Sequence, residues 1–157
     1  MRIKIGENVR IGKWTVIGAL PLNLEPEGEW MKRKPVNAGI VIEDDVDIGA
    51  NSVICCGCTE DTLIEEHSWI GHNCLIGHDA KIRKGSIICS GVSILGHAEV
   101  GSKSYVAPGS VVRNRVRIGV NTIIGLGSVV LEEVPSNVVA YGNPCRVIRS
   151  NEGGIPR

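Results

Sequence analysis

The chain has 157 residues, a length typical of one compact domain. Its 17 basic and 17 acidic side chains cancel and form no basic cluster, which argues against a nucleic-acid partner. The sequence contains neither a signal-peptide pattern nor an apolar run long enough to span a bilayer. We therefore expect a soluble cytoplasmic protein without membrane insertion.

A six-residue repeat dominates the sequence. From residue 64 to residue 130, Ile or Val stands at every sixth position without exception. This period fits neither a helix nor an alternating strand. It is typical of hexapeptide repeats, in which short parallel strands wind around a triangular prism. One hexad covers one face, so three hexads form a coil and residues 18 apart in sequence stack.

Two earlier runs, Ile5 to Ile17 and Ile42 to Ile54, extend the register. Together the hexads suffice for six coils, about 4.8 Å apart, or roughly 30 Å of prism. We predict an all-β parallel β-helix in a single domain, residues 1–157, with its coils at 1–18 and 39–130. Because so narrow a prism buries only a thin core, we expect flat faces to pack between copies in a homotrimer.

The register breaks twice, and each break predicts a loop. Residues 19–38 form a protruding loop that holds three prolines and Trp30. This loop is either an acceptor-binding arm that reaches a neighbouring subunit or a mobile excursion. Four extra residues also bulge out between Ile54 and Ile64, where three of the six cysteines lie. We expect free thiols there and no metal, because their spacing fits no zinc pattern.

The period ends after Val130. Pro135 and Pro144 cannot donate hydrogen bonds to a strand ladder, so residues 131–157 are expected to form a C-terminal cap and tail. Such a cap protects the open edge of a solenoid.

The repeat also locates a candidate active site. His72 and His78 both lie two residues after a core aliphatic, at outward-facing corners. One coil beyond His78 stands Gly96, followed by His97, so these three residues should share a corner. A histidine beside a free backbone N–H suits acyl transfer, which needs a base and an oxyanion donor. Asp79 either favours the imidazolium form of His78 or serves only the turn.

The motifs resemble those of the hexapeptide-repeat acyltransferases. IGHDA at 76–80 and ILGHAEV at 94–100 resemble the UDP-N-acetylglucosamine O-acyltransferase of lipid A synthesis. IGANSVICCGCTEDTLI at 48–64 resembles the lipid A N-acyltransferase. The stretch from IGHDA to VPSNVVAYGNPCRVI resembles sugar acetyltransferases of the sialic-acid and bacillosamine type. The resemblance implies a left-handed β-helix with His78 as general base and Gly96 as oxyanion donor. His72 falls where these patterns require no catalytic histidine.

The resemblance implies two possible acyl donors. The lipid A enzymes use acyl carrier protein and have a functional histidine about two coils beyond the base, where this chain has Arg113 and Arg115. The ending YGNPCRVIR instead resembles the cap of acetyl-CoA-dependent enzymes. By that resemblance the candidates for a coenzyme A slot are Ala107, Gly125, Pro144 and Arg146. Arg146 either meets a phosphate of the coenzyme or merely covers the prism edge.

We therefore predict an acetyl-CoA-dependent acetyltransferase that acts on an amine or hydroxyl of a sugar, itself nucleotide-linked. His97, His72 and Trp30 are expected to contact the acceptor, since Trp30 is the one aromatic in the loop that can stack on a base. An acyl-carrier-protein-dependent UDP-sugar acyltransferase is the alternative. A γ-type carbonic anhydrase, suggested by the spacing of His67 and His72, and a non-catalytic trimeric scaffold are further alternatives.

Overall fold

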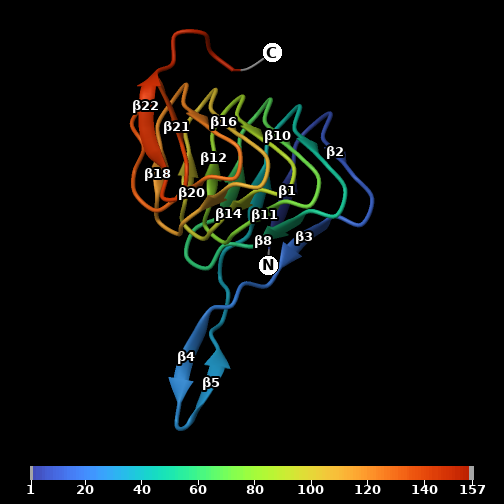
Figure 1. The fold of residues 1–157 in the computed structure, drawn as a ribbon. Helices are drawn as coiled ribbons and strands as arrows, with labels where there is room; N and C mark the ends of the chain where they lie inside the picture. The colour runs from blue at the N-terminus through green and yellow to red at the C-terminus, as the bar shows by residue number, and fades with distance from the viewer. Residues whose placement is uncertain (1, 156–157) are drawn as a thin grey trace.

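A computed structural model describes residues 2–155 and forms a triangular prism of parallel strands (Figure 1). We call its three faces sheets A, B and C. Sheet A consists of β1 (Ile3–Ile5), β6 (Ile40–Ile42), β9 (Thr62–Ile64), β12 (Lys81–Ile82), β15 (Glu99–Val100) and β18 (Arg117–Ile118).

Sheets B and C complete the prism. Sheet B consists of β2 (Arg10–Ile11), β7 (Asp47–Ile48), β10 (Trp69–Ile70), β13 (Ile87–Ile88), β16 (Tyr105–Val106), β19 (Ile123–Ile124), β21 (Val138–Tyr141) and β22 (Arg146–Ser150). Sheet C consists of β3 (Val16–Ala19), β8 (Val53–Cys55), β11 (Leu75–Ile76), β14 (Ser93–Ile94), β17 (Val111–Val112) and β20 (Val129–Val130). The predicted fold class is confirmed.

Strand pairing follows the 18-residue coil. Leu75 pairs with Ser93, and Val111 pairs with Val129. Val53 pairs with Leu75, 22 residues later, because the four-residue insertion lies in that coil. Val16 pairs with Val53, because residues 19–38 leave the prism between them.

The core is a stack of aliphatic side chains. Every repeat position from Ile64 to Val130 is buried. The small residues two positions earlier also face inward, and Ser86, Ser104 and Ser110 donate their hydroxyls to backbone carbonyls one coil later, at 2.7–3.0 Å. Among the described residues no buried side-chain N or O atom lacks a hydrogen-bond partner.

Both ends of the prism depart from the repeat. At the N-terminal end Ile5 and Ile11 are about half exposed, at 49% and 42%. At the other end β21 adds to β19 in parallel, and β22 then pairs with β21 antiparallel, which closes that edge of sheet B. Residues 2–155 contain no helix of the length and hydropathy needed to cross a membrane.

The segment 19–38 is more ordered than the predicted loop. It contains an antiparallel hairpin of β4 (Leu24–Glu27) and β5 (Trp30–Arg33) that projects away from the prism (Figure 1). Gly28 adopts φ +63° in its turn, a conformation in which glycine carries no side-chain strain. The six-residue criterion could not detect this hairpin, because its strands pair with each other and not with a coil.

We predict that Ile88→Ala lowers the free energy of unfolding by about 2–5 kcal/mol, because a cavity opens between Ile70 and Val106, its neighbours in the stack. Denaturant unfolding measures the change. Ile88→Val should cost only about 0.5–1.5 kcal/mol. Equal losses for the two variants would contradict the packing described for this core.

Candidate active site

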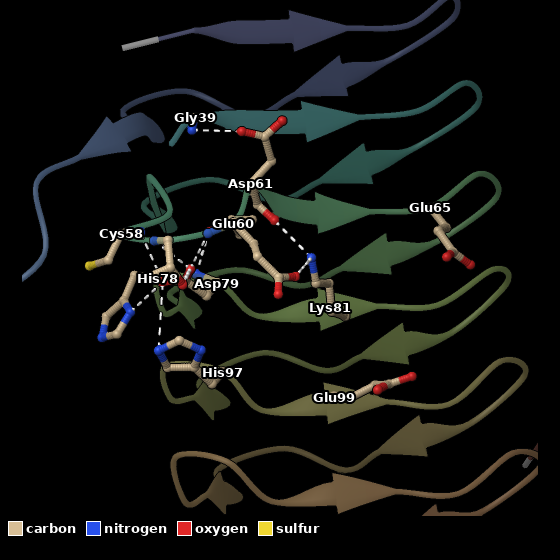
Figure 2. Close-up of polar contacts among 12 residues, drawn as sticks. Gly39, Cys58, Glu60, Asp61, Glu65, His78, Asp79, Lys81, His97 and Glu99 are labelled. Atoms are coloured by element: carbon tan, nitrogen blue, oxygen red, sulfur yellow. Dashed lines mark hydrogen bonds and ion pairs between the residues drawn. The ribbon is translucent and has the colours of Figure 1, made fainter. Parts of the chain in front are cut away.

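The candidate site lies at the corner where the chain passes from sheet C to sheet A. His78 follows β11, and Asp79 leads into β12 (Figure 2). Asp79 and His97 occupy equivalent positions in successive coils and share the left-handed backbone conformation, with φ of 58° and 59°. Asp, Asn and His tolerate this conformation better than most residues. The N–H of His97 donates to the carbonyl of His78 at 2.8 Å, which links the two successive coils at this corner.

His78 and Asp79 form a dyad. Nδ1 of His78 lies 2.8 Å from Oδ2 of Asp79. The His78 side chain is 31% exposed, whereas that of Asp79 is 1% exposed. A carboxylate accepts a hydrogen bond, so Nδ1 carries the proton and Nε2 presents its lone pair. Of the two roles considered for Asp79, the geometry supports the contact with His78, because the left-handed turn brings both side chains to one side.

The four-residue insertion holds Asp79 in place. The backbone N–H groups of Cys58, Thr59 and Glu60 donate to its carboxylate at 2.6–2.8 Å, and the Thr59 hydroxyl donates at 2.7 Å. Burial alone would raise the pKa of Asp79, but these hydrogen bonds and the one from His78 outweigh it and hold the pKa well below its usual value. Asp79 is therefore an anion throughout the neutral range.

Sequence reasoning missed this role of residues 58–60. A signal was present, because subtracting one coil from position 79 gives position 61, at the edge of the insertion. An acidic residue that lies one coil beyond an insertion can accept hydrogen bonds from the backbone N–H groups of that insertion.

Gly96 packs directly against the His78 ring. A Cβ built on Gly96 would lie 2.5 Å from Nε2 of His78, so only glycine leaves room for the imidazole. Within residues 2–155 the Gly96 N–H has no hydrogen-bond partner. His97 completes the corner: its ring meets that of His78 edge to face with centroids 5.1 Å apart, and its Nε2 lies 3.8 Å from Oδ2 of Asp79. The predicted meeting of His78, Gly96 and His97 is found in the structure.

A cleft of about 450 Å³ opens onto this corner. Lys34 and Arg115 bring positive charge to its wall, and the base of the β4–β5 hairpin forms one side. The lining also includes Asn23, Pro35, Asn37, Cys58, Thr59, His78, Gly96, His97 and Asn114. A larger hollow of about 660 Å³ surrounds Trp69 on sheet B, but it contains neither His78 nor Gly96.

Two of the predicted acceptor contacts lie elsewhere. His72 is at the corner between sheets B and C, where its Nδ1 accepts the Ala50 N–H at 2.8 Å. Trp30 begins β5 at the far end of the hairpin and is 78% exposed (Figure 1). Neither residue lines the cleft at His78 within one chain.

The candidates for the coenzyme slot also lie away from His78. Ala107 and Gly125 stack at the corner between sheets B and C, and Tyr141 covers Gly125. Pro144 and Arg146 belong to the cap, where the Arg146 guanidinium lies 3.9 Å from Glu132. These four residues therefore lie at the corner between sheets B and C and in the cap, and none of them lines the cleft at His78.

Cys58 is the remaining reactive group beside the dyad. Burial, followed by the nearby Asp79 carboxylate, raises the pKa of its thiol to about 11, so it is protonated at neutral pH. His67 and His72, the pair that suggested a carbonic anhydrase, lie at different corners. His67 faces Asp45, with Nδ1 3.6 Å from its carboxylate.

Comparison with known proteins agrees with this fold. Residues 61–96 match the family model for the bacterial transferase hexapeptide (six repeats). The match covers part of the stretch in which the six-residue period runs without a break. The solved structure of LpxA from Acinetobacter baumannii superposes with a TM-score of 0.84 at 25% identity, over 95% of this chain and 56% of that one. This hexapeptide-repeat chain is therefore a left-handed parallel β-helix, as predicted.

Curated relatives of this hexapeptide-repeat chain include the acyl-[acyl-carrier-protein]–UDP-N-acetylglucosamine O-acyltransferase of Burkholderia orbicola, 29% identical over 98% of this chain. The chain spans 57% of that relative's length. A perosamine N-acetyltransferase from Caulobacter crescentus, solved with CoA and GDP-perosamine, shares the fold at 19% identity and a TM-score of 0.53, over 92% of this chain and 57% of that one.

We predict that Asp79→Asn destabilises the protein most at neutral pH. The pKa of Asp79 is lower in the folded state than in the unfolded state. The ionised carboxylate therefore raises the free energy of unfolding above about pH 4, and this contribution is lost progressively as the pH falls below that value. Denaturant unfolding from pH 7 to pH 2.5 should show the gap between variant and parent closing below about pH 4. Glu132→Gln, at an exposed carboxylate, serves as control; a gap that stays constant in acid would contradict the assignment.

We predict that Gly96→Ala displaces the His78 ring without unfolding the chain. The backbone of Gly96 is outside the left-handed region, and the three atoms nearest its new Cβ all belong to the imidazole of His78, a side chain that can move. Gly101→Ala is the matched control, because its Cβ would lie 2.5 Å from the backbone of Gly119. Thermal unfolding should show a lower Tm for Gly101→Ala than for Gly96→Ala; the reverse order would refute the geometry.

Proposed function

We propose that this chain is an acyltransferase that moves an acyl group from a thioester to a hydroxyl or amine of a nucleotide-linked sugar. The observation that carries the proposal is the contact of a buried, ionised Asp79 with His78 Nδ1, which leaves Nε2 packed against Gly96, whose N–H has no hydrogen-bond partner among residues 2–155. This arrangement supplies a base and an oxyanion donor within one corner.

The proposed reaction proceeds in two steps. The acceptor oxygen or nitrogen attacks the thioester carbonyl carbon while its proton moves to Nε2 of His78. The Gly96 N–H hydrogen-bonds the resulting oxyanion, and Asp79 stabilises the imidazolium. When the tetrahedral intermediate collapses, the C–S bond breaks, the leaving sulfur takes the proton from His78, and the donor is released as a thiol.

The relatives favour an acyl carrier protein over acetyl-CoA as donor. The curated relatives in the comparison are named as acyl-carrier-protein-dependent UDP-N-acetylglucosamine acyltransferases. The expectation of acetyl-CoA is supported by a structural neighbour at 19% identity, which shares the fold alone. We therefore put forward the acyl-carrier-protein-dependent UDP-sugar acyltransferase, first considered as the alternative, as the better hypothesis.

A diphosphate-linked acceptor suits the charge of the cleft. Lys34 and Arg115 line it, and none of the lining residues within 2–155 is Asp or Glu, although the chain as a whole is neutral. Phosphate oxygens would pair with these two cations while the sugar hydroxyl reaches His78.

We further propose that the chain works as a homotrimer. Most of the strand residues that face outward on sheets B and C are apolar, among them Trp69, Ile87 and Ile123 on sheet B and Leu75, Val111 and Val129 on sheet C, whereas Arg10 and Asp47 on sheet B and Ser93 on sheet C are polar. Sheet A instead carries an ionic ladder in which Arg83 pairs with Glu65 and Glu99. Two apolar faces per copy suit a ring in which each copy packs against two others.

We predict that His78→Ala lowers kcat by about 100-fold to 10,000-fold, because the acceptor then has no general base. Transfer would be measured with purified acyl-carrier-protein thioesters and with acetyl-CoA, each against UDP-N-acetylglucosamine and against the free sugar. His72→Ala is the matched control, since this histidine lies at another corner, and should keep the parent rate.

Three outcomes would change the proposal. Full turnover by His78→Ala would remove the assigned base. Faster transfer from acetyl-CoA than from any carrier-protein thioester would restore the acetyltransferase hypothesis. Equal transfer to free and nucleotide-linked sugar would refute the role given to Lys34 and Arg115.

A further inference from the structure

The corner at His78 contains more potential metal ligands than the proposed acyl transfer uses. The Sγ of Cys58, a ring nitrogen of His78 and a carboxylate oxygen of Asp79 all lie within 4.8 Å of one another. The Nε2 of His97 lies 3.8 Å from the Asp79 carboxylate on another side. Figure 2 shows Cys58, His78 and His97 near Asp79, with Cys58 and His97 in the coils before and after that of His78 and Asp79.

The chemical nature of these donor atoms favours zinc over magnesium and calcium. Thiolate sulfur, imidazole nitrogen and a carboxylate are the ligands that zinc takes in proteins. Magnesium and calcium prefer oxygen and discriminate against sulfur. Zinc bonds of about 2.0–2.3 Å place neighbouring ligands about 3.3–3.8 Å apart. The wider pairs of the set must therefore close by up to about 1.5 Å, while His78 Nδ1 and Asp79 Oδ2, now 2.8 Å apart, must separate by about 0.5–1 Å. Cys58 lies in the insertion between β8 and β9, outside any strand.

We propose that this corner is an inhibitory site for a thiophilic divalent cation, zinc above all, bound by Cys58 Sγ, His78 Nδ1 and Asp79. The spacing of the cysteines in sequence gives no hint of it, because Cys58 lies one coil before His78 and Asp79. The binding step stands on the donor geometry, and the inhibition rests on the proposed function.

The inhibition follows from the tautomer of His78. Without the cation, Nδ1 carries the proton shared with Asp79, and Nε2 is free to accept one. A cation bound at Nδ1 takes the lone pair of that nitrogen, so the neutral ring carries its proton on Nε2. The nitrogen that faces Gly96 is then unable to accept the acceptor's proton. The Cys58 thiol loses its proton to solvent on binding, and its thiolate, with the Asp79 carboxylate, balances the two charges of the cation.

The binding step is tested with the metals alone. Cobalt(II) titrated into the parent chain should produce the thiolate-to-cobalt charge-transfer absorption, and calorimetry should show one zinc bound per chain. Cys58→Ser should lose the absorption and weaken zinc affinity at least about tenfold, as changes at metal sites commonly do. Cys55→Ser is the matched control, a half-buried thiol in the same segment but outside the cluster. No charge-transfer absorption in the parent, or equal zinc affinity in Cys58→Ser, overturns the site.

The inhibition is tested by acyl transfer at increasing zinc, with each variant compared with its own rate in a chelator. The parent and Cys55→Ser should be inhibited reversibly, magnesium should have no effect, and Cys58→Ser should need at least about tenfold more zinc. An active parent that binds zinc without inhibition overturns the regulatory role. A parent that shows the cobalt absorption but transfers no acyl group refutes the proposed function and leaves the metal site standing.

Discussion

The stacking of Ile and Val side chains at intervals of 18 residues is the constraint on which the rest of this molecule depends. Each buried side chain contacts its counterparts one coil before and after, while the strands that carry them pair in parallel. A shift of one residue would turn the aliphatic side chains outward. Burial of these side chains therefore fixes the register, and the register in turn fixes the position of every corner.

The candidate active-site corner depends on this rigidity. The prism sets His78 against Gly96, because the two positions are one coil apart. Orientation of the His78 ring requires a second element, the insertion at 55–61, whose backbone N–H groups keep Asp79 ionised beneath the surface. A regular coil also directs single backbone N–H groups at carboxylates, as Lys84 does to Glu65 at 2.8 Å, but the insertion brings three consecutive backbone N–H groups to one carboxylate.

The same corner has two possible states. The hydrogen bond between His78 and Asp79 sets the tautomer needed for a general base, and the Cys58 thiol next to it completes a cluster of zinc-type ligands. The two uses compete for Nδ1 of His78. The positive charge of Lys34 and Arg115 in the surrounding cleft favours an anionic acceptor and disfavours a cation, so the metal would be held by its direct ligands alone.

The fold and the stacked pair of His78 and Gly96 could be predicted because both depend on a periodic pattern. The hairpin of β4 and β5 could not, because its strands pair outside the repeat. The link between Asp79 and His78 also depends on tertiary structure, since neighbouring residues on a strand point apart unless the backbone turns left-handed, as it does at Asp79. Residues 58–60 hydrogen-bond the Asp79 carboxylate, and Cys58 lies beside the dyad of His78 and Asp79. These contacts join segments about twenty residues apart in the sequence. Periodicity along the chain is sufficient to specify the coils, whereas the contacts between an irregular insertion and the corner beneath it arise only when the coils are stacked.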